Sequence, residues 1–159
     1  MTIAAGDKIP GSTLTIMGEK GPMPLTTDEI FSGRKVVLFS VPGAFTPTCS
    51  AKHLPGFIEH AEEILAAGVD TIACVAVNDV FVMDAWGKNA NAQDILMLAD
   101  GNGDFAAALG LEMDASSFGM GRRSQRFALV ADDGIVTRLF VEGPGEFRIS
   151  SAEHVLSSL

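Results

Sequence analysis

The apolar residues of the chain fall into short clusters whose spacing changes from segment to segment. Three continuous runs of β-branched, aliphatic and aromatic residues are typical of strands covered on both faces: 35–41, 71–77 and 95–99. Three further segments have apolar residues at helical spacing: 54–67, 80–86 and 104–109. Gly68 and Gly110 stand where helix C-terminal caps belong. Because strand and helix alternate repeatedly, the pattern predicts a parallel α/β core.

The segment before this core predicts an N-terminal extension. Residues 14–17 fit a short strand, and the glycine-flanked residues 18–21 fit a turn. Thr26 or Thr27 can then cap a brief helix that ends at Phe31. We therefore expect this extension to contribute one strand and one short helix.

The segment after the core predicts an antiparallel hairpin. Strand-like runs at 125–131 and 135–141 are separated by an Asp-Gly pair at 133–134, which is a strong hairpin signal. Ser150 or Ser151 then caps a final helix. This order is that of a thioredoxin-like fold, an α/β architecture with a central mixed sheet flanked by helices, here with an N-terminal extension.

Length and composition favour one domain. At 159 residues with 47% hydrophobic residues, the chain can form one well-packed core, and we expect a single domain over residues 1–159. The 11 basic and 20 acidic residues give a net charge of −9, which argues against nucleic acid and acidic membrane surfaces as partners. No apolar stretch approaches the roughly 18 residues of a membrane helix. Because the N-terminal residues lack the basic and apolar regions of a signal peptide, we expect a cytoplasmic protein.

The strongest candidate for chemistry is Cys49, which follows the strand at 35–41 and opens the next helix. Two cysteines in a chain of this length predict reduced thiols rather than a disulfide framework. A thiol in the first turn of a helix faces unpaired backbone N–H groups, which favour the thiolate. Thr46 can turn its hydroxyl toward the sulfur, while Pro42 and Pro47 stiffen the loop. An arginine from another strand could complete the set of donors.

Three motifs give the chain a resemblance to a known family. They are PGAFTPTCSAKHLPGF, which begins at Pro42, CVAVNDVFVMDAWGK, which begins at Cys74, and FGMGRRSQRFALVADDGIV, which begins at Phe118. The first contains the Pro-x-x-x-Thr-x-x-Cys pattern of peroxiredoxins. Together the three closely resemble the type II, or peroxiredoxin-5-like, subfamily, and the resemblance covers most of the chain.

The resemblance implies a thiol-dependent peroxidase that reduces hydrogen peroxide and organic hydroperoxides, with a role in antioxidant defence and redox homeostasis. By resemblance, Cys49 is the nucleophile that becomes a sulfenic acid, and Thr46 hydrogen-bonds the peroxide. Pro42 then shields the pocket, and Arg126 holds the thiolate and polarises the peroxide. The family also implies a thioredoxin-like fold, a homodimer whose interface includes the Cys49 loop, and a reaction without metal, haem or flavin.

The chain departs from the animal members of this subfamily in one respect. Those members carry a third cysteine near the C-terminus that resolves the sulfenic acid, whereas residues 142–159 contain none. Cys74 has the position of the second cysteine of plant-type members, but it lies in a strand that the pattern predicts to be buried. We therefore expect an external thiol to reduce Cys49, either glutathione with glutaredoxin or thioredoxin.

Several residues and functions keep alternative interpretations. Cys74 fits core packing better than a resolving role, and His53 fits a structural or pKa-tuning role better than a metal site. Arg122 and Arg123 are expected to be exposed, and Phe118 is expected in the pocket wall. A peroxide sensor or a redox-regulated holdase could use the same cysteine. A thioredoxin-like disulfide reductase is disfavoured because a threonine replaces the first cysteine of the C-x-x-C pair.

Overall fold

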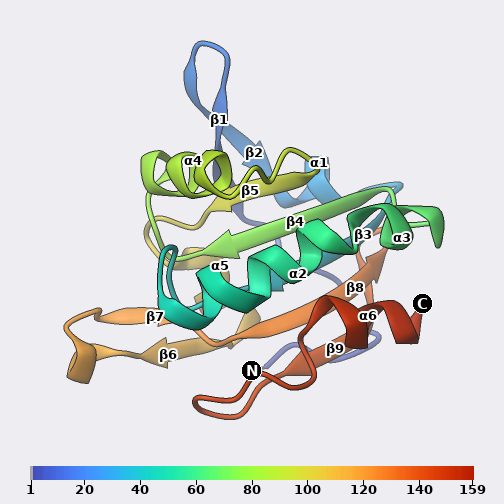
Figure 1. Ribbon diagram of the computed structural model, residues 1–159. Coiled ribbons are helices and arrows are strands. Elements are labelled where there is room, and N and C mark those ends of the chain that lie inside the picture. The colour runs from blue at the N-terminus through green and yellow to red at the C-terminus, as the bar shows by residue number, and fades with distance from the viewer. Residues whose placement is uncertain (1) are drawn as a thin grey trace.

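A seven-stranded mixed sheet forms the centre of the computed structural model, which describes residues 2–159 (Figure 1). The strands follow the order β2-β1-β5-β4-β3-β8-β9. Neighbouring strands are parallel within β5-β4-β3 and antiparallel at every other pairing. The bounds are β1 Thr13–Gly18, β2 Gly21–Thr26, β3 Lys35–Ser40, β4 Thr71–Ala76, β5 Ile95–Ala99, β8 Phe127–Asp132 and β9 Ile135–Val141.

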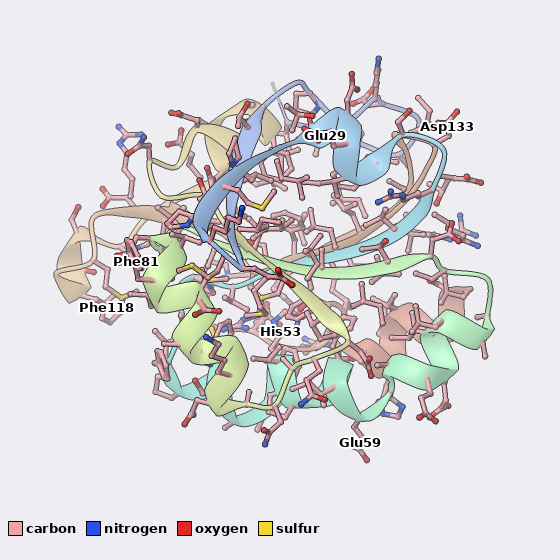
Figure 2. All side chains as sticks on the ribbon, turned by 90° about the horizontal axis from the view of Figure 1, so that it is seen from above. Glu29, His53, Glu59, Phe81, Phe118 and Asp133 are labelled. Carbon is pink, nitrogen blue, oxygen red and sulfur yellow. The ribbon has the colours of Figure 1, made fainter. Side chains whose placement is uncertain are left out.

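Helices cover both faces of this sheet. One face packs against α2 (Leu54–Glu59), α3 (Ala61–Ala66), α4 (Val80–Asn89) and α6 (Ala152–Ser158). The opposite face packs against α1 (Thr27–Phe31) and α5 (Asp104–Leu109). Successive side chains of a strand point to opposite faces, so Phe39 of β3 joins the first layer and Leu38 joins the second. Figure 2 shows α1 near Glu29 and α2 near Glu59 on opposite sides of the sheet.

The predicted architecture of a mixed α/β sheet flanked by helices is confirmed. The three parallel strands, the hairpin and the terminal helix all lie within a few residues of their predicted positions. The helix after Gly103 is confirmed from Asp104 to Leu109, and the Thr26 side chain caps α1 in a capping box with Glu29. None of the helices within residues 2–159 is long and apolar enough to cross a membrane.

The structure differs from the sequence prediction at several places. The predicted helix over 54–67 is divided at His60, whose backbone (φ −98°, ψ 8°) leaves the helical region while the apolar face continues into α3. The strand predicted from residue 125 begins at Phe127. An antiparallel ribbon of β6 (Glu112–Asp114) and β7 (Arg122–Ser124), joined through the 3₁₀ turn Ser116–Phe118, was not predicted, because three-residue strands are too short to show a period.

Strand β2 was also missed, since two prolines interrupt its pattern. It forms the edge of the sheet, where Pro22 pairs with Met17 and Pro24 pairs with Thr15. In an antiparallel ladder every second N–H points away from the partner strand, and a proline has no N–H to give to the ladder. Pro22 and Pro24 stand at two of the positions whose N–H would point outward. The third such position is Thr26, whose N–H donates to Glu29 Oε1 at 3.1 Å. The outer edge of β2 therefore presents no free backbone donor.

Candidate active site

Cys49 lies at the end of the sheet where β3 and β4 finish. After Ser40 the chain forms a loop, becomes helical at Pro47, and continues as a single π-helical turn, Cys49–His53, in which the Leu54 N–H donates to the Cys49 carbonyl. The sequence predicted an α-helical turn here, and the observed turn is one residue wider. Cys49 is fully buried. The nucleophile candidate is therefore held away from bulk water.

The loop before Cys49 is fixed by neighbouring elements. The Ala44 N–H donates to Asn78 Oδ1 at 2.9 Å, which ties the loop to the segment after β4. Trp86 Nε1 on α4 donates to Ser50 Oγ at 3.1 Å, which ties the start of the π-helical turn to α4. Phe45 has φ 63°, a left-handed conformation that is strained for a bulky residue. These contacts hold a strained loop in one geometry directly before the cysteine.

Two donors reach the sulfur of Cys49. Thr46 Oγ1 lies 2.8 Å from Sγ and 2.7 Å from the Gly43 carbonyl oxygen. Arg126 Nη2 lies 3.1 Å from Sγ and comes from the junction between β7 and β8. A thiolate only accepts hydrogen bonds, so in that state Thr46 can direct its single hydroxyl proton to the sulfur. The structure thus brings together three of the residues predicted from sequence, although Arg126 is distant in the chain.

His53 orients Arg126. Arg126 Nη1 lies 2.7 Å from His53 Nδ1, and His53 Nε2 lies 2.9 Å from the Ser150 carbonyl oxygen. Because an arginine only donates and a carbonyl only accepts, the imidazole proton belongs on Nε2 and Nδ1 is the acceptor. The Phe147 ring lies 4.9 Å from the His53 ring and 5.7 Å from the guanidinium carbon of Arg126. Figure 2 shows His53 between the sheet and the helices of this layer.

Burial and the adjacent Arg126 charge lower the pKa of His53 to about 3. The imidazole is therefore neutral at physiological pH, which it must be in order to accept from the guanidinium. His53 is thus a neutral acceptor that shares Arg126 with the sulfur, and its structural or pKa-tuning role stays a prediction. The contact between His53 and Arg126 was not predicted from the sequence, in which 73 positions separate the two residues.

A pocket of about 730 Å³ leads to these residues. Pro42, Thr46 and Arg126 line it, so the predicted shielding proline and both donors belong to the same pocket. Strand β6 and the connection from β6 to β7 also line the pocket, including Phe118, which is 82% exposed. Phe118 therefore lies in the pocket wall, as the sequence predicted. The loop after β9, from Glu142 to Glu146, also lines the pocket.

Arg123 is less exposed than expected. Its Nε donates to the Met120 carbonyl at 2.9 Å, and its Nη1 approaches the Pro42 carbonyl at 3.5 Å. Arg122, in contrast, is exposed and pairs with Glu112 across the ribbon. Arg123 therefore attaches the unpredicted β6–β7 ribbon to the loop that precedes Cys49, and Figure 1 shows this ribbon extending from the same end of the molecule.

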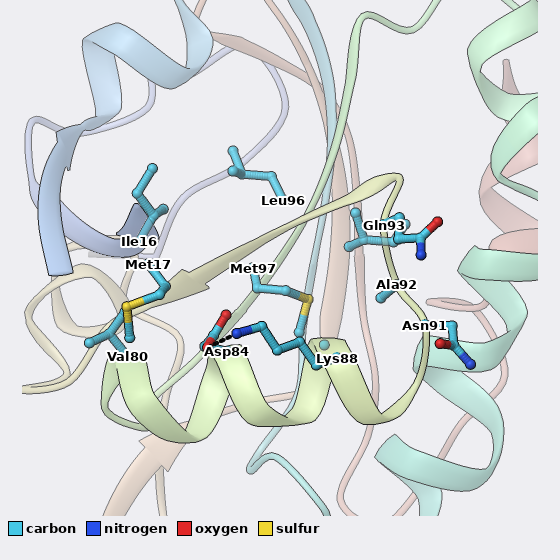
Figure 3. A pocket seen from close by; sticks show the side chains of 12 residues that line it. Ile16, Met17, Val80, Asp84, Lys88, Asn91, Ala92, Gln93, Leu96 and Met97 are labelled. Atoms are coloured by element: carbon cyan, nitrogen blue, oxygen red, sulfur yellow. Dashed lines mark ion pairs between the residues drawn. The ribbon is translucent and has the colours of Figure 1, made fainter. Parts of the chain in front are cut away.

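A second groove lies between α4 and β5 (Figure 3). It has a volume of about 350 Å³, an apolar floor that includes Met17 and Met97, and an ion pair between Asp84 and Lys88 at 2.9 Å. None of the side chains that contact the Cys49 sulfur lines it. The larger pocket is therefore the candidate active site.

Cys74 is fully buried in β4, as the sequence predicted. It pairs with Phe39 of β3 on one side and with Met97 of β5 on the other. Burial, together with the nearby Cys49, raises the pKa of the Cys74 thiol well above its usual value. Cys74 is therefore a core residue that stays protonated, unlike a thiol prepared for nucleophilic attack.

Comparison with known proteins shows the family to which the chain belongs. The redoxin family matches residues 4–156. A chloroplastic protein named peroxiredoxin-2E-2 from Oryza sativa subsp. japonica is 54% identical over 164 residues, which cover 99% of this chain and 73% of that protein. Peroxiredoxin-2B from Arabidopsis thaliana is 49% identical over 159 residues, covering 99% of this chain and 98% of that protein. Reduced Prx3 from Vibrio vulnificus, in a crystal structure with H₂O₂, has a TM-score of 0.96 at 54% identity, with 99% of each chain covered.

These matches extend over nearly all the elements described above, so the fold is thioredoxin-like and the class of protein is a thiol-dependent peroxidase. The chain belongs to the redoxin family, and within it to the type II peroxiredoxins, as the three sequence motifs predict.

Proposed function

We propose that Cys49 is the peroxidatic cysteine. Its thiolate attacks the terminal oxygen of a hydroperoxide, an S–O bond forms, the O–O bond breaks, and the alkoxide or hydroxide that leaves takes up a proton to give an alcohol or water. Cys49 is left as a sulfenic acid. The observation that supports this most strongly is the pair of donors on one sulfur, Thr46 at 2.8 Å and Arg126 at 3.1 Å.

Thr46 and Arg126 support the reaction beyond forming the thiolate. Lowering a thiol pKa also lowers its nucleophilicity, so thiolate formation alone gives a limited rate gain. Donors beside the sulfur can also hydrogen-bond the peroxide oxygens and stabilise the charge that develops on the leaving oxygen. Pro42 has no N–H to compete for the peroxide, and it narrows the pocket next to them.

A cysteine exchange tests this assignment. The Cys49→Ser protein should lose peroxide consumption, measured with hydrogen peroxide and with an organic hydroperoxide. The Cys74→Ala protein is the matched control and should keep at least half of the activity, because Cys74 is a buried core thiol. Full activity in the Cys49→Ser protein would exclude Cys49 as the nucleophile.

We also propose that an external thiol completes the cycle. A thiol attacks the sulfenic sulfur, water leaves, and a mixed disulfide forms, which a second thiol reduces to restore Cys49. Cys74 lies within the central sheet, so a disulfide with Cys49 would require the π-helical turn to unfold first. Glutathione with glutaredoxin, or thioredoxin, is the proposed donor, and no metal, haem or flavin takes part.

Mass spectrometry of the oxidised protein distinguishes these routes. After one equivalent of peroxide and excess glutathione, the expected product is a glutathione adduct on Cys49. A disulfide between Cys49 and Cys74 as the main product would contradict the external route. Repeated turnover with added thiol also separates a peroxidase from the sensor or holdase alternative, in which one oxidation event persists. Dialysis against a chelator should leave turnover unchanged.

We further propose that the protein is a homodimer and that it is located in the cytoplasm. Phe45, Phe81 and Phe118 are 50%, 64% and 82% exposed, and each belongs to the end of the molecule where β3 and β4 finish. Exposed aromatic residues are typical of protein interfaces. Sedimentation should give twice the monomer mass, and Phe81→Ser should lower it. The chloroplastic names belong to those relatives, so imaging of a tagged chain tests the compartment.

A further inference from the structure

Glu142 is a buried carboxylate at the end of β9 that the peroxidase reaction does not use directly. It is 6% exposed. One oxygen, Oε2, accepts from the backbone N–H groups of Arg148, Ile149 and Ser150 at 2.7, 2.9 and 2.8 Å. The same oxygen accepts from Ser150 Oγ at 2.7 Å. Four hydrogen bonds on one oxygen fix both ends of the loop that joins β9 to α6.

The fixed loop reaches the active-site arginine. Ser150, held by Glu142, presents its carbonyl to His53 Nε2 at 2.9 Å. His53 in turn accepts from Arg126 at 2.7 Å, and Arg126 donates to the Cys49 sulfur at 3.1 Å. The Glu142 N–H also donates to the Arg126 carbonyl at 3.0 Å. Glu142 therefore touches the backbone of Arg126 directly and its guanidinium through two intermediate residues.

The charge of Glu142 suits this position. Burial acts to raise its pKa, but the hydrogen bonds from Ser150, Arg148 and Ile149 outweigh burial and lower the pKa of Glu142 below its usual value. Each of these donors therefore stabilises the ionised form of the Glu142 carboxylate. Phe147, within the same loop, packs on the His53 ring and on the Arg126 guanidinium, so a displaced loop would remove one packing partner from each of these side chains.

We propose that Glu142 is a positioning residue that sets the reactivity of Cys49 by holding the 143–150 loop, and through Ser150 and His53 the Arg126 guanidinium, against the sulfur. The proposal rests on the role assigned to Cys49 and Arg126 above. The side-chain partners of the Cys49 sulfur are Thr46 and Arg126, and Glu142 is not among them. Its effect must therefore disappear when Arg126 is already unable to act.

A double-mutant cycle measures that dependence. Glu142→Ala should lower the second-order rate of peroxide reduction at least tenfold in the otherwise unchanged protein. In the Arg126→Gln background, the same substitution should lower the remaining rate by less than twofold. Equal fold-losses in the two backgrounds would show that Glu142 acts independently of Arg126 and would overturn the proposal.

Alkylation of Cys49 gives a second readout that needs no peroxide. The midpoint of its pH profile with iodoacetamide should move to higher pH in Glu142→Ala, because a displaced guanidinium no longer favours the thiolate. Glu142→Gln keeps side-chain size and one acceptor oxygen, so it should fold and give a smaller shift in the same direction. Glu62→Gln, which removes an exposed carboxylate on α3, is the charge control and should give no shift.

These readouts separate the two proposals. If peroxide reduction survives in Cys49→Ser, the assignment of the nucleophile fails, whereas the alkylation profile still tests whether Glu142 positions Arg126. If Glu142→Ala and Glu142→Gln both keep the wild-type alkylation midpoint and react with peroxide within twofold of the wild-type rate, the positioning role fails while the peroxidase assignment stands. A lower melting temperature without a change in midpoint would likewise count against it.

Discussion

Arg126 donates to the sulfur of Cys49 across 3.1 Å although 77 positions separate the two residues. The same guanidinium donates through its other terminal nitrogen to His53 at 2.7 Å. A planar group with two donors in fixed directions can satisfy a sulfur and an imidazole at the same time. The geometry therefore depends on arginine specifically, as well as on its positive charge.

Replacing Arg126 by lysine tests this dependence. A lysine keeps the charge but has one compact ammonium group, which cannot contact both the Cys49 sulfur and His53 in the same way. Loss of an electrostatic donor to the transition state costs about 100-fold or more in rate. Stopped-flow measurement with hydrogen peroxide should show at least this loss in Arg126→Lys, with circular dichroism unchanged. A lysine protein within tenfold of wild type would show that charge alone suffices.

The hydroxyl of Thr46 should matter more than its methyl group. Thr46→Val keeps the shape of the side chain but removes the donor at 2.8 Å from the sulfur. A hydrogen bond to a charged group contributes about 1.5–3 kcal/mol, which corresponds to a rate loss of roughly 10- to 150-fold. Thr46→Ser keeps the hydroxyl and should retain most of the activity. Similar rates for the valine and serine proteins would contradict this reasoning.

The buried His53 should make the fold sensitive to acid. In the unfolded chain this histidine takes up a proton below about pH 6.5. In the folded chain burial and Arg126 lower its pKa to about 3, so between these pH values the unfolded state binds more protons. The free energy of unfolding should therefore decrease as the pH falls from about 6.5, by up to about 1.4 kcal/mol per pH unit. Urea denaturation should give a shallower dependence for His53→Gln. Equal slopes would mean that His53 does not contribute.

The acidic residues of the pocket should discriminate between hydroperoxides. Glu112, Asp114 and Glu146 are among the residues that line the pocket, and the whole chain carries a net charge of −9. A hydroperoxide with a carboxylate substituent should therefore react more slowly than a neutral one of similar size, such as cumene hydroperoxide. Added salt should reduce the difference, because the screening length falls to about 3 Å at 1 M. Asp114→Asn, which keeps an acceptor for the Ser116 N–H, should reduce the difference in rate between the two hydroperoxides at low salt.

The parts of the structure that follow from local pattern were predictable, and the parts that depend on distant contacts were less so. The buried strands and the Asp-Gly hairpin have periods or turn residues that the sequence displays directly. Arg126 was found only through a family motif, since nothing near it in the sequence indicates contact with Cys49. The burial of Glu142 could not be predicted from the sequence, because a glutamate that follows a strand is ordinarily exposed to solvent.

The β6–β7 ribbon illustrates the same limit. Its strands have three residues each, and its attachment to the loop before Cys49 depends on Arg123, whose Nη1 approaches the Pro42 carbonyl from 81 positions away in the sequence. The wide turn at Cys49 was equally hidden, because an α-helix and a π-helical turn place apolar residues on nearly the same face over so short a span. Pocket walls and local helix geometry are set by tertiary packing, which a single sequence does not display.

The prolines of β2 also bear on how copies of the protein can associate. An incoming strand would find no backbone donor at Pro22 or Pro24, and the start of the opposite edge, at Ile135, is already bridged by Lys8. Strand-by-strand growth into fibres is therefore blocked at β2, and contact between copies is directed to side-chain surfaces, where a two-fold pair closes on itself. A chain with valine at both proline positions should keep its peroxidase chemistry yet scatter light as concentration rises, because the outer edge of β2 would then offer backbone donors to a strand of another copy.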